Sequence, residues 1–192
     1  MEPKKLRFQK KLTFFFLFSL LSGLSLNAIG QESEVNVIFK AIEKNQVDQI
    51  RTLLETGTDP NIKDALRNTP LHMAAFYGYE DVIDLLASKG GDVNAINEAG
   101  RSPLYEAVRA DHQQAVSALI ANGAKLTPKY TDKRFTILHF AAMENRYEIS
   151  EILLENGANL KVKDALGKKP ADYAKATKNK MLVKLYKDKR WK

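Results

Sequence analysis

The pattern of hydrophobic and polar positions predicts pairs of short helices joined by polar loops. In the stretch 69–94, TPLHMAAFYGYEDVIDLLASKGGDVN, the residues Leu71, Ala74 and Ala75 fall at i, i+3 and i+4, so they share one face of a helix. The two alanines would let a neighbouring helix approach closely. After a break at Gly78, the apolar face of a second helix is predicted from Val82, Ile83, Leu85 and Leu86.

Residues at the ends of these segments support the same boundaries. Thr69 is expected to cap the first helix through its hydroxyl, and Pro70 follows at the first helical position, where its missing N–H costs nothing. Gly90 can end the second helix because glycine tolerates a positive φ. One such pair leaves its apolar face exposed until another pair covers it.

The unit recurs along the chain. The motif that starts at Thr69 returns at Ser102, at Thr136 and, in a weaker form, at Lys169, in steps of 33, 34 and 33 residues. The loop glycines keep the same register at Gly57, Gly90, Gly123 and Gly157. Self-similarity at this period indicates a solenoid of stacked units.

The region from Val37 to Ala174 resembles the ankyrin-repeat family. The resemblance rests on TPLHMAA with GGDVN, SPLYEAV, TILHFAA with LLENGAN, and LLETGTDPN. It implies an all-α solenoid of helix-turn-helix units with β-turn fingers. The expected parts are an N-terminal cap 37–63, repeats 64–96, 97–130 and 131–163, the start of a C-terminal cap 164–174, and a basic capping helix and tail 175–192. The finger near Pro128 has one extra residue, either a tolerated insertion or a distinctive contact loop.

Composition limits the number of domains and the kinds of chemical site in the chain. A chain of 192 residues that is 44% hydrophobic suffices for one domain with one core. The absence of cysteine excludes disulfides, thiolate metal sites and a cysteine nucleophile.

The first thirty residues are predicted to be a secretory signal peptide. Five basic residues precede an uncharged apolar run over 12–26, and Ala28-Ile29-Gly30 supplies small residues at a cleavage site. Residues 31–36 would then form a polar linker. These features suggest a bacterial protein that is exported to the periplasm or the medium. The alternative is an uncleaved inner-membrane anchor through residues 12–31, since a spanning helix needs about 20 apolar residues.

The net charge of +7 is unevenly distributed. Residues 1–30 carry +4, residues 175–192 carry +7 and the remainder carries −4, so the repeat body is mildly acidic. The last helix is expected to carry Met181, Leu182, Leu185 and Tyr186 on one apolar face and lysines around the rest. This basic C-terminus fits a terminal cap with a solvated outer face. A weak contact with an anionic membrane is an alternative role for it. Export argues against nucleic acid as a partner.

Candidate chemistry is sparse. The resemblance implies that His72 and His139 brace the finger turns, and His112 lies on a loop without a second ligand near it in sequence. No phosphate-binding glycine loop, HExxH motif or nucleophile elbow is present. We therefore expect no enzyme, no cofactor and no metal site, and a small hydrolase is the most remote alternative.

The resemblance implies that the chain binds another protein through finger positions and the residues after the alanine pair. On this sequence these partner-binding positions are Leu66, Asn68, Phe76, Tyr77, Glu98, Arg101, Arg109, Lys133, Phe135, Met143 and Glu144. The expected partner is another envelope protein, which the chain would protect or assist as a monomer. A secreted effector that binds a host protein is the alternative. For the adjacent aromatic residues Phe76 and Tyr77 there is a second interpretation. Phe76 would pack under the next finger, and only Tyr77 would be free to contact a partner.

Overall fold

A computed structural model describes residues 34–127 and 134–191. The chain divides into two units, 1–37 and 38–192. The expected signal peptide, the finger insertion at Pro128 and the candidate Lys133 lie outside the described residues. Residues 34–43 are helical, so the last three residues of the expected linker, 34–36, belong to a helix.

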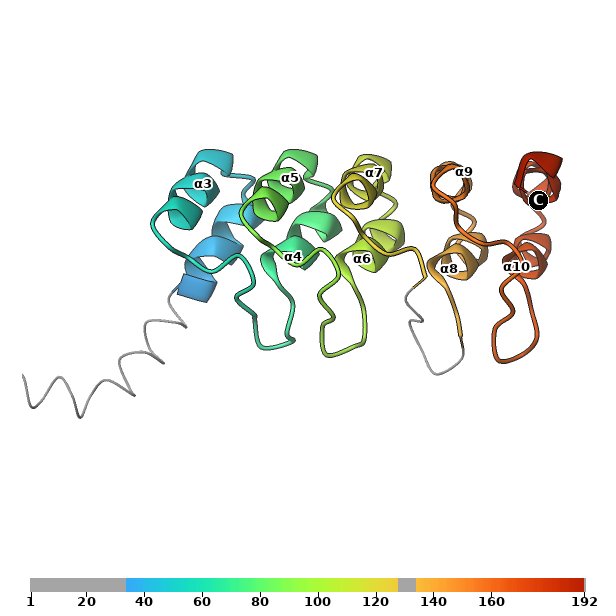
Figure 1. Ribbon diagram of the computed structural model, residues 1–192, viewed down its shortest axis with the longest axis horizontal. Coiled ribbons are helices and arrows are strands. Elements are labelled where there is room, and N and C mark those ends of the chain that lie inside the picture. The colour runs from blue at the N-terminus through green and yellow to red at the C-terminus, as the bar shows by residue number, and fades with distance from the viewer. Residues whose placement is uncertain (1–33, 128–133, 192) are drawn as a thin grey trace, which may run out of the picture. The chain divides into compact units, whose positions relative to one another are not determined.

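Helix pairs repeat through the second unit, with first helices in one row and second helices in another (Figure 1). The first helices are α4 (Pro70–Tyr77), α6 (Pro103–Ala110), α8 (Ile137–Met143) and α10 (Pro170–Ala176). The second helices are α3 (Val47–Glu55), α5 (Glu80–Ser88), α7 (Gln113–Ala121), α9 (Tyr147–Glu155) and α11 (Lys180–Lys187), which a 3₁₀ turn (Lys189–Trp191) follows. No strand occurs in the described part of the chain. The all-α solenoid predicted from the sequence is confirmed.

The first helices begin at the expected caps, although the chemistry of the cap varies. The Oγ of Ser102 accepts a hydrogen bond from the backbone N–H of Tyr105 at 3.2 Å. At Thr69 the ring of His72 also takes part, in a capping box: the Thr69 side chain accepts from the backbone of residue 72, and the backbone N–H of Thr69 donates to His72 Nδ1 at 3.1 Å. Thr136 and His139 repeat this arrangement at 3.1 Å. Each cap satisfies a backbone group that the first turn leaves without a helical partner.

Left-handed residues separate the two helices of a pair and end the second helix. Gly78 has φ 79° at the break, where a Cβ would come within 2.6 Å of the ring of His112. Gly90, with φ 89°, ends α5 as expected. Its N–H donates to Ala87 O at 3.0 Å, and the next N–H, of Gly91, donates to Leu86 O at 2.9 Å. These two bonds form a Schellman motif, which satisfies terminal carbonyls of the helix.

The core consists of the apolar faces that the helical spacing predicts. Leu71, Ala74 and Ala75 of α4 are fully buried, as are Val82, Ile83 and Leu86 of α5. Asparagine side chains at the start of two successive fingers, Asn61 and Asn94, then join neighbouring units. Asn61 donates from Nδ2 to Gly90 O at 3.0 Å and accepts from the N–H of Asp92 at 2.7 Å. Asn94 makes the equivalent pair of bonds to the next unit, with Gly123 and Lys125.

The C-terminal helix α11 covers the last full unit. Leu182, Leu185 and Tyr186 are buried, and the single O–H of Tyr186 lies within hydrogen-bonding distance of two acceptors, Ser150 Oγ at 3.0 Å and Leu138 O at 3.2 Å. Met181 was expected on the same apolar face, but this prediction is wrong, because its side chain is 66% exposed. The buried face follows i, i+3, i+4 from Leu182, and Met181 falls outside it. None of the helices in the described residues is long and apolar enough to span a membrane.

Candidate functional site

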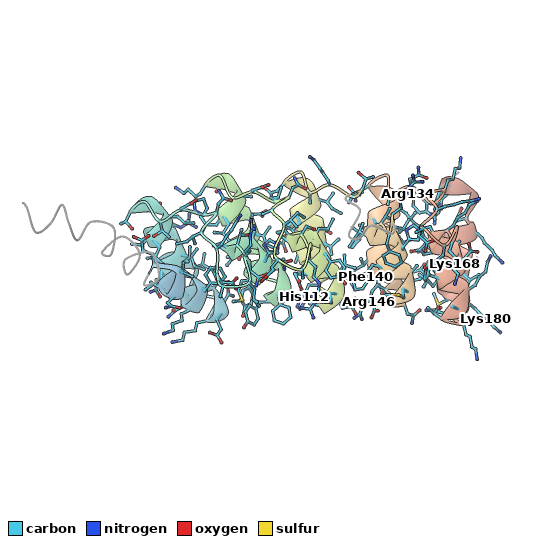
Figure 2. The ribbon with its side chains drawn as sticks, turned by 90° about the horizontal axis from the view of Figure 1, so that it is seen from below. His112, Arg134, Phe140, Arg146, Lys168 and Lys180 are labelled. Atoms are coloured by element: carbon cyan, nitrogen blue, oxygen red, sulfur yellow. The ribbon has the colours of Figure 1, made fainter. Side chains whose placement is uncertain are left out.

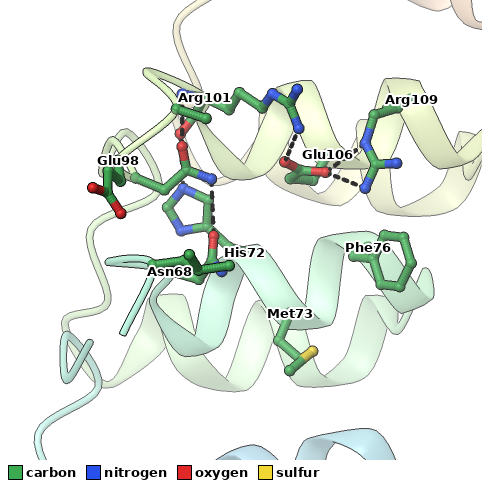
Figure 3. Close-up of a pocket in the computed structure, with 11 residues that line it drawn as sticks. Asn68, His72, Met73, Phe76, Glu98, Arg101, Glu106 and Arg109 are labelled. Atoms are coloured by element: carbon green, nitrogen blue, oxygen red, sulfur yellow. Dashed lines mark hydrogen bonds and ion pairs between the residues drawn. The ribbon is translucent and has the colours of Figure 1, made fainter. Parts of the chain in front are cut away.

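A hollow of about 500 Å³ opens between α4 and α6 and the fingers that precede them (Figure 3). Six of the residues predicted for partner binding line it: Leu66, Asn68, Phe76, Glu98, Arg101 and Arg109. The remaining lining residues are His72, Met73, Asn97, Ala99 and Glu106. The hollow therefore brings together candidates from two successive units.

Hydrogen bonds across the two fingers fix the wall of the hollow. Asn97 donates from Nδ2 to Asn68 Oδ1 at 2.8 Å and accepts on Oδ1 from the N–H of Arg101 at 2.9 Å. The backbone N–H of Glu98 donates to Leu66 O at 3.0 Å. Because these polar groups find their hydrogen-bond partners within the two fingers, the fingers form a continuous wall.

His72 ties this wall to helix α4. Its Nδ1 accepts from the N–H of Thr69, so its Nε2 carries the proton and donates to the carbonyl oxygen of Arg101 at 2.9 Å. Burial lowers the pKa of His72 and favours the neutral ring that both bonds require. His139 makes the same link to Lys168 O at 3.2 Å, and burial lowers its pKa as well. The bracing role expected for these histidines matches this geometry.

A buried carboxylate holds two arginines at the floor of the hollow. Glu106 is only 6% exposed, and its Oε2 accepts from Arg109 Nη2 at 2.7 Å and from Arg109 Nε at 2.8 Å. Its Oε1 lies 3.7 Å from Arg101 Nη1. Figure 3 shows both guanidinium groups directed toward this one carboxylate. The two-point contact of Arg109 with the carboxylate restricts the orientation of its guanidinium plane.

Aromatic contacts complete the site. The guanidinium of Arg109 lies 5.1 Å from the ring centroid of Phe76, and that of Arg101 lies 5.3 Å from the ring of Tyr105. Tyr77 does not line the hollow, since it stacks on Tyr79 at 5.5 Å and meets the edge of Phe76 at 5.2 Å. Phe76 faces the hollow and is 39% exposed, so the interpretation that it packs away under the next finger is wrong.

The candidates of the fourth unit lie outside the hollow. Phe135 packs edge-on against Tyr173 at 5.4 Å, and the exposed residues Met143 and Glu144 end helix α8. Tyr173 in turn donates to Asp164 Oδ2 at 2.5 Å, which raises the pKa of Tyr173 to about 12. Phe135 therefore belongs to a packed cluster, and a binding role for these three residues stays a prediction.

His112 and Arg146 occupy equivalent places before second helices, along the same edge of the molecule (Figure 2). Arg146 reaches back to the preceding unit, where its Nη1 lies 2.7 Å from Asp111 Oδ2. The ring of His112 packs at Gly78. Within residues 34–127 and 134–191, no three His, Cys, Asp or Glu side chains come together as a metal site would need.

The sequence interpretation missed Glu106 and the neighbouring lining residues Met73, Asn97 and Ala99. A signal for Glu106 was present, because it lies three residues before Arg109, the helical spacing of an ion pair. Its burial gave no such signal, since acidic residues are usually solvated and the sequence does not show how closely α4 approaches α6.

The family model described as "Ankyrin repeats (3 copies)" matches residues 13–97, 38–130 and 92–164. Similar proteins include the ankyrin repeat protein FPV222 of Fowlpox virus (strain NVSL), 34% identical over 68% of this chain and 17% of that protein. The potassium channel SKOR of Arabidopsis thaliana is 30% identical over 88% of this chain and 24% of the channel. Neurogenic locus notch homolog protein 1 of Mus musculus is 30% identical over 73% of this chain and 6% of that protein. The chain thus spans less than a quarter of the length of each of these relatives.

Proposed function

Because the chain belongs to the ankyrin-repeat family, a non-enzymatic protein-interaction fold, we propose that it is an exported scaffold that binds another envelope protein through the hollow between α4 and α6. The observation that carries this proposal is the hollow itself. It combines exposed apolar side chains with fixed polar groups, and binding sites commonly have this composition. The scaffold would protect or assist its partner and act as a monomer.

The exposed apolar residues support a docking role for this face. Leu66 is 62% exposed at the rim, and Phe76 lies within reach of a partner at the other end of the hollow. Aromatic and arginine side chains dominate many protein interfaces, and Phe76 and Arg109 here are already in contact. A partner that covers them would therefore find side chains held close to their bound positions.

Site-specific cross-linking would test the binding face. A photoreactive amino acid at Leu66 should form a covalent product with the partner in intact cells. Met181 on α11 is the matched control, because it is an apolar residue of nearly equal exposure, 66% against 62%, outside the hollow. Phe76→Ala should reduce the product formed from position 66. A product from position 181 and none from position 66 would place the partner on another face.

Export is the second part of the proposal, and it rests on the sequence of residues 1–30. N-terminal sequencing of the mature protein should give a start at or near Gln31, and fractionation should recover it from the periplasm. Recovery from the medium would favour the alternative, a secreted effector that binds a host protein. A membrane-bound protein that retains Met1 would replace the signal peptide with an anchor.

A weak membrane contact through the basic C-terminus is the third part of the proposal. Lys180, Lys184 and Lys187 are exposed on α11, and residues 175–192 carry a net charge of +7, whereas residues 31–174 carry −4. Vesicles of phosphatidylglycerol and phosphatidylcholine should retain the protein at low salt, whereas pure phosphatidylcholine vesicles should not. Replacing the three lysines with glutamine should abolish retention if they supply the contact.

A further inference from the structure

The charges at the floor of the hollow are not balanced. Arg101 and Arg109 share the single carboxylate of Glu106, which leaves one positive charge in excess. Glu98 is the other acidic residue of the lining, and it is exposed on the finger, with its carboxylate turned away from both arginines in Figure 3. The floor of the hollow is therefore electropositive although the repeat body is acidic.

The two guanidinium groups also keep unused donors. A guanidinium has five N–H donors, and Arg109 uses those of Nε and one of Nη2 on Glu106. The side chains of Arg101 and Arg109 are 42% and 41% exposed. Their remaining donors can reach a group that enters the hollow, and Glu106 limits the conformational freedom that they lose on binding.

Apolar surface lies directly beside these donors. Phe76 lies under the guanidinium of Arg109, while Met73 and Leu66 continue the lining toward the finger. A volume of about 500 Å³ accommodates two side chains of a partner and not a whole helix. A ligand that fits would therefore present one anionic and one apolar side chain next to each other.

We propose that the hollow binds a segment of the partner protein that carries an Asp or Glu side chain beside an apolar residue. This inference rests on the proposed function and names the chemistry of its partner. The carboxylate accepts hydrogen bonds from Arg101 and Arg109, and the apolar side chain packs on Phe76 and Met73. A planar guanidinium can bind a carboxylate through two N–H groups, so the acidic residue would fix the register of the segment.

A display library of random octapeptides tests the proposal. The wild-type protein should enrich sequences in which Asp or Glu adjoins Leu, Met, Ile or Phe. A synthetic peptide of the enriched sequence should then bind about tenfold more tightly than the same peptide with Asn or Gln in place of the acid, since a charged hydrogen bond is lost. The preference should fall as salt is added.

Two variants separate recognition from folding. Arg101→Gln leaves the 2.7 Å contact between Arg109 and Glu106 in place, so the protein should fold and the preference for the acidic peptide should shrink. The triple variant Arg101→Gln, Arg109→Gln and Glu106→Gln removes both cations and leaves no buried carboxylate without a partner, so acidic and amide peptides should bind it about equally. Arg51→Gln, an exposed arginine on α3, is the control that should retain the full preference.

Equal binding of acidic and amide peptides by the wild-type protein would overturn the inference, as would enrichment of sequences without an acid or no enrichment at all. If cross-linking from position 66 still succeeds, the proposed function stands and only the chemistry of the partner is wrong. If it also fails, both proposals fall together.

Discussion

At the residue scale, the carboxylate of Glu106 affects the candidate site in two ways. It holds Arg101 and Arg109 at the floor of the hollow, and it neutralises one of their two positive charges. It is 6% exposed and contacts two arginines that are themselves only partly buried. Removing its closest partner, Arg109, would leave this buried carboxylate desolvated without compensation, which costs more than the pair itself contributes. Glu98 lines the same hollow from an exposed position and provides a natural comparison.

Glu106→Ala is expected to lower the free energy of unfolding by about 1–3 kcal/mol, because Arg109 loses its hydrogen-bonding partner. Glu98→Ala should change it by less than about 0.5 kcal/mol, as is usual for an exposed side chain. Urea denaturation followed by circular dichroism measures both. Equal effects of the two substitutions would mean that the contact between Glu106 and Arg109 does not persist in solution.

The buried histidines predict a pH dependence. Burial lowers the pKa of His72 and of His139 below the usual value of 6.5, so the unfolded chain binds protons at a pH where the folded chain does not. Their contribution to stability is complete above pH 6.5 and is lost as the pH falls through the folded pKa values. The free energy of unfolding should therefore decrease from pH 6.5 toward pH 5. The pKa of Asp164 and that of Asp172 are held below the usual 3.8, so these carboxylates do not titrate in this window.

His72→Gln combined with His139→Gln should flatten this slope, although it lowers stability at pH 8 through the lost braces. His112→Gln is the matched control, because His112 lies before a second helix and braces no finger. A slope that is unchanged in the double variant would assign the pH dependence to other groups.

At the element scale, the buried face of each helix was the feature best predicted from the sequence, because it depends only on local periodicity. Helix faces repeat every three or four residues, so the buried positions of α4 and α5 could be predicted from spacing alone. Contacts between units could not be predicted in this way, because they depend on how closely helices approach. The burial of Glu106 is of this kind. The binding positions were predicted from the family pattern. That pattern indicates which surface residues contact a partner, but it does not show whether they line a hollow.

Two roles were suggested for the last helix, α11: it covers the last full unit, and its lysines contact an anionic membrane. Two variants separate these roles. Deleting residues 180–192 removes Leu182, Leu185 and Tyr186 from the apolar face of the last full unit, including the hydrogen bond to Leu138 O. We expect a lower melting temperature and aggregation on size exclusion, since a terminal unit needs a cover. Lys180→Gln, Lys184→Gln and Lys187→Gln together should leave melting nearly unchanged. Aggregation of the lysine variant would show that the charges themselves maintain solubility.

At the scale of the whole repeat body, 38–191, the junction between α6 and α8 differs from its neighbours. The first helices α4 and α6 pack closely, as do α8 and α10, but α6 and α8 touch at few positions. Tyr105 takes the place of the bracing histidine and stacks on Phe140 at 4.5 Å between these two helices. Thr127 stands where Asn61 and Asn94 join the earlier units. Since each unit is stabilised only by its neighbours, a weak junction should let the two sides unfold separately.

A cavity made on one side of this junction should therefore lower the stability of the units on the other side only weakly. Leu86 is fully buried in α5, so Leu86→Ala should cost about 2–5 kcal/mol in the units around it. Trp191 is the single tryptophan and follows α11 at the far end, so its fluorescence reports on the C-terminal units. In urea, the substitution should lower the midpoint seen by circular dichroism more than the midpoint seen by fluorescence. Leu153→Ala in α9 is the reciprocal control, which should shift the fluorescence midpoint most. If both probes shift equally for both variants, the junction transmits stability as well as the others, and the repeat body unfolds as one cooperative unit.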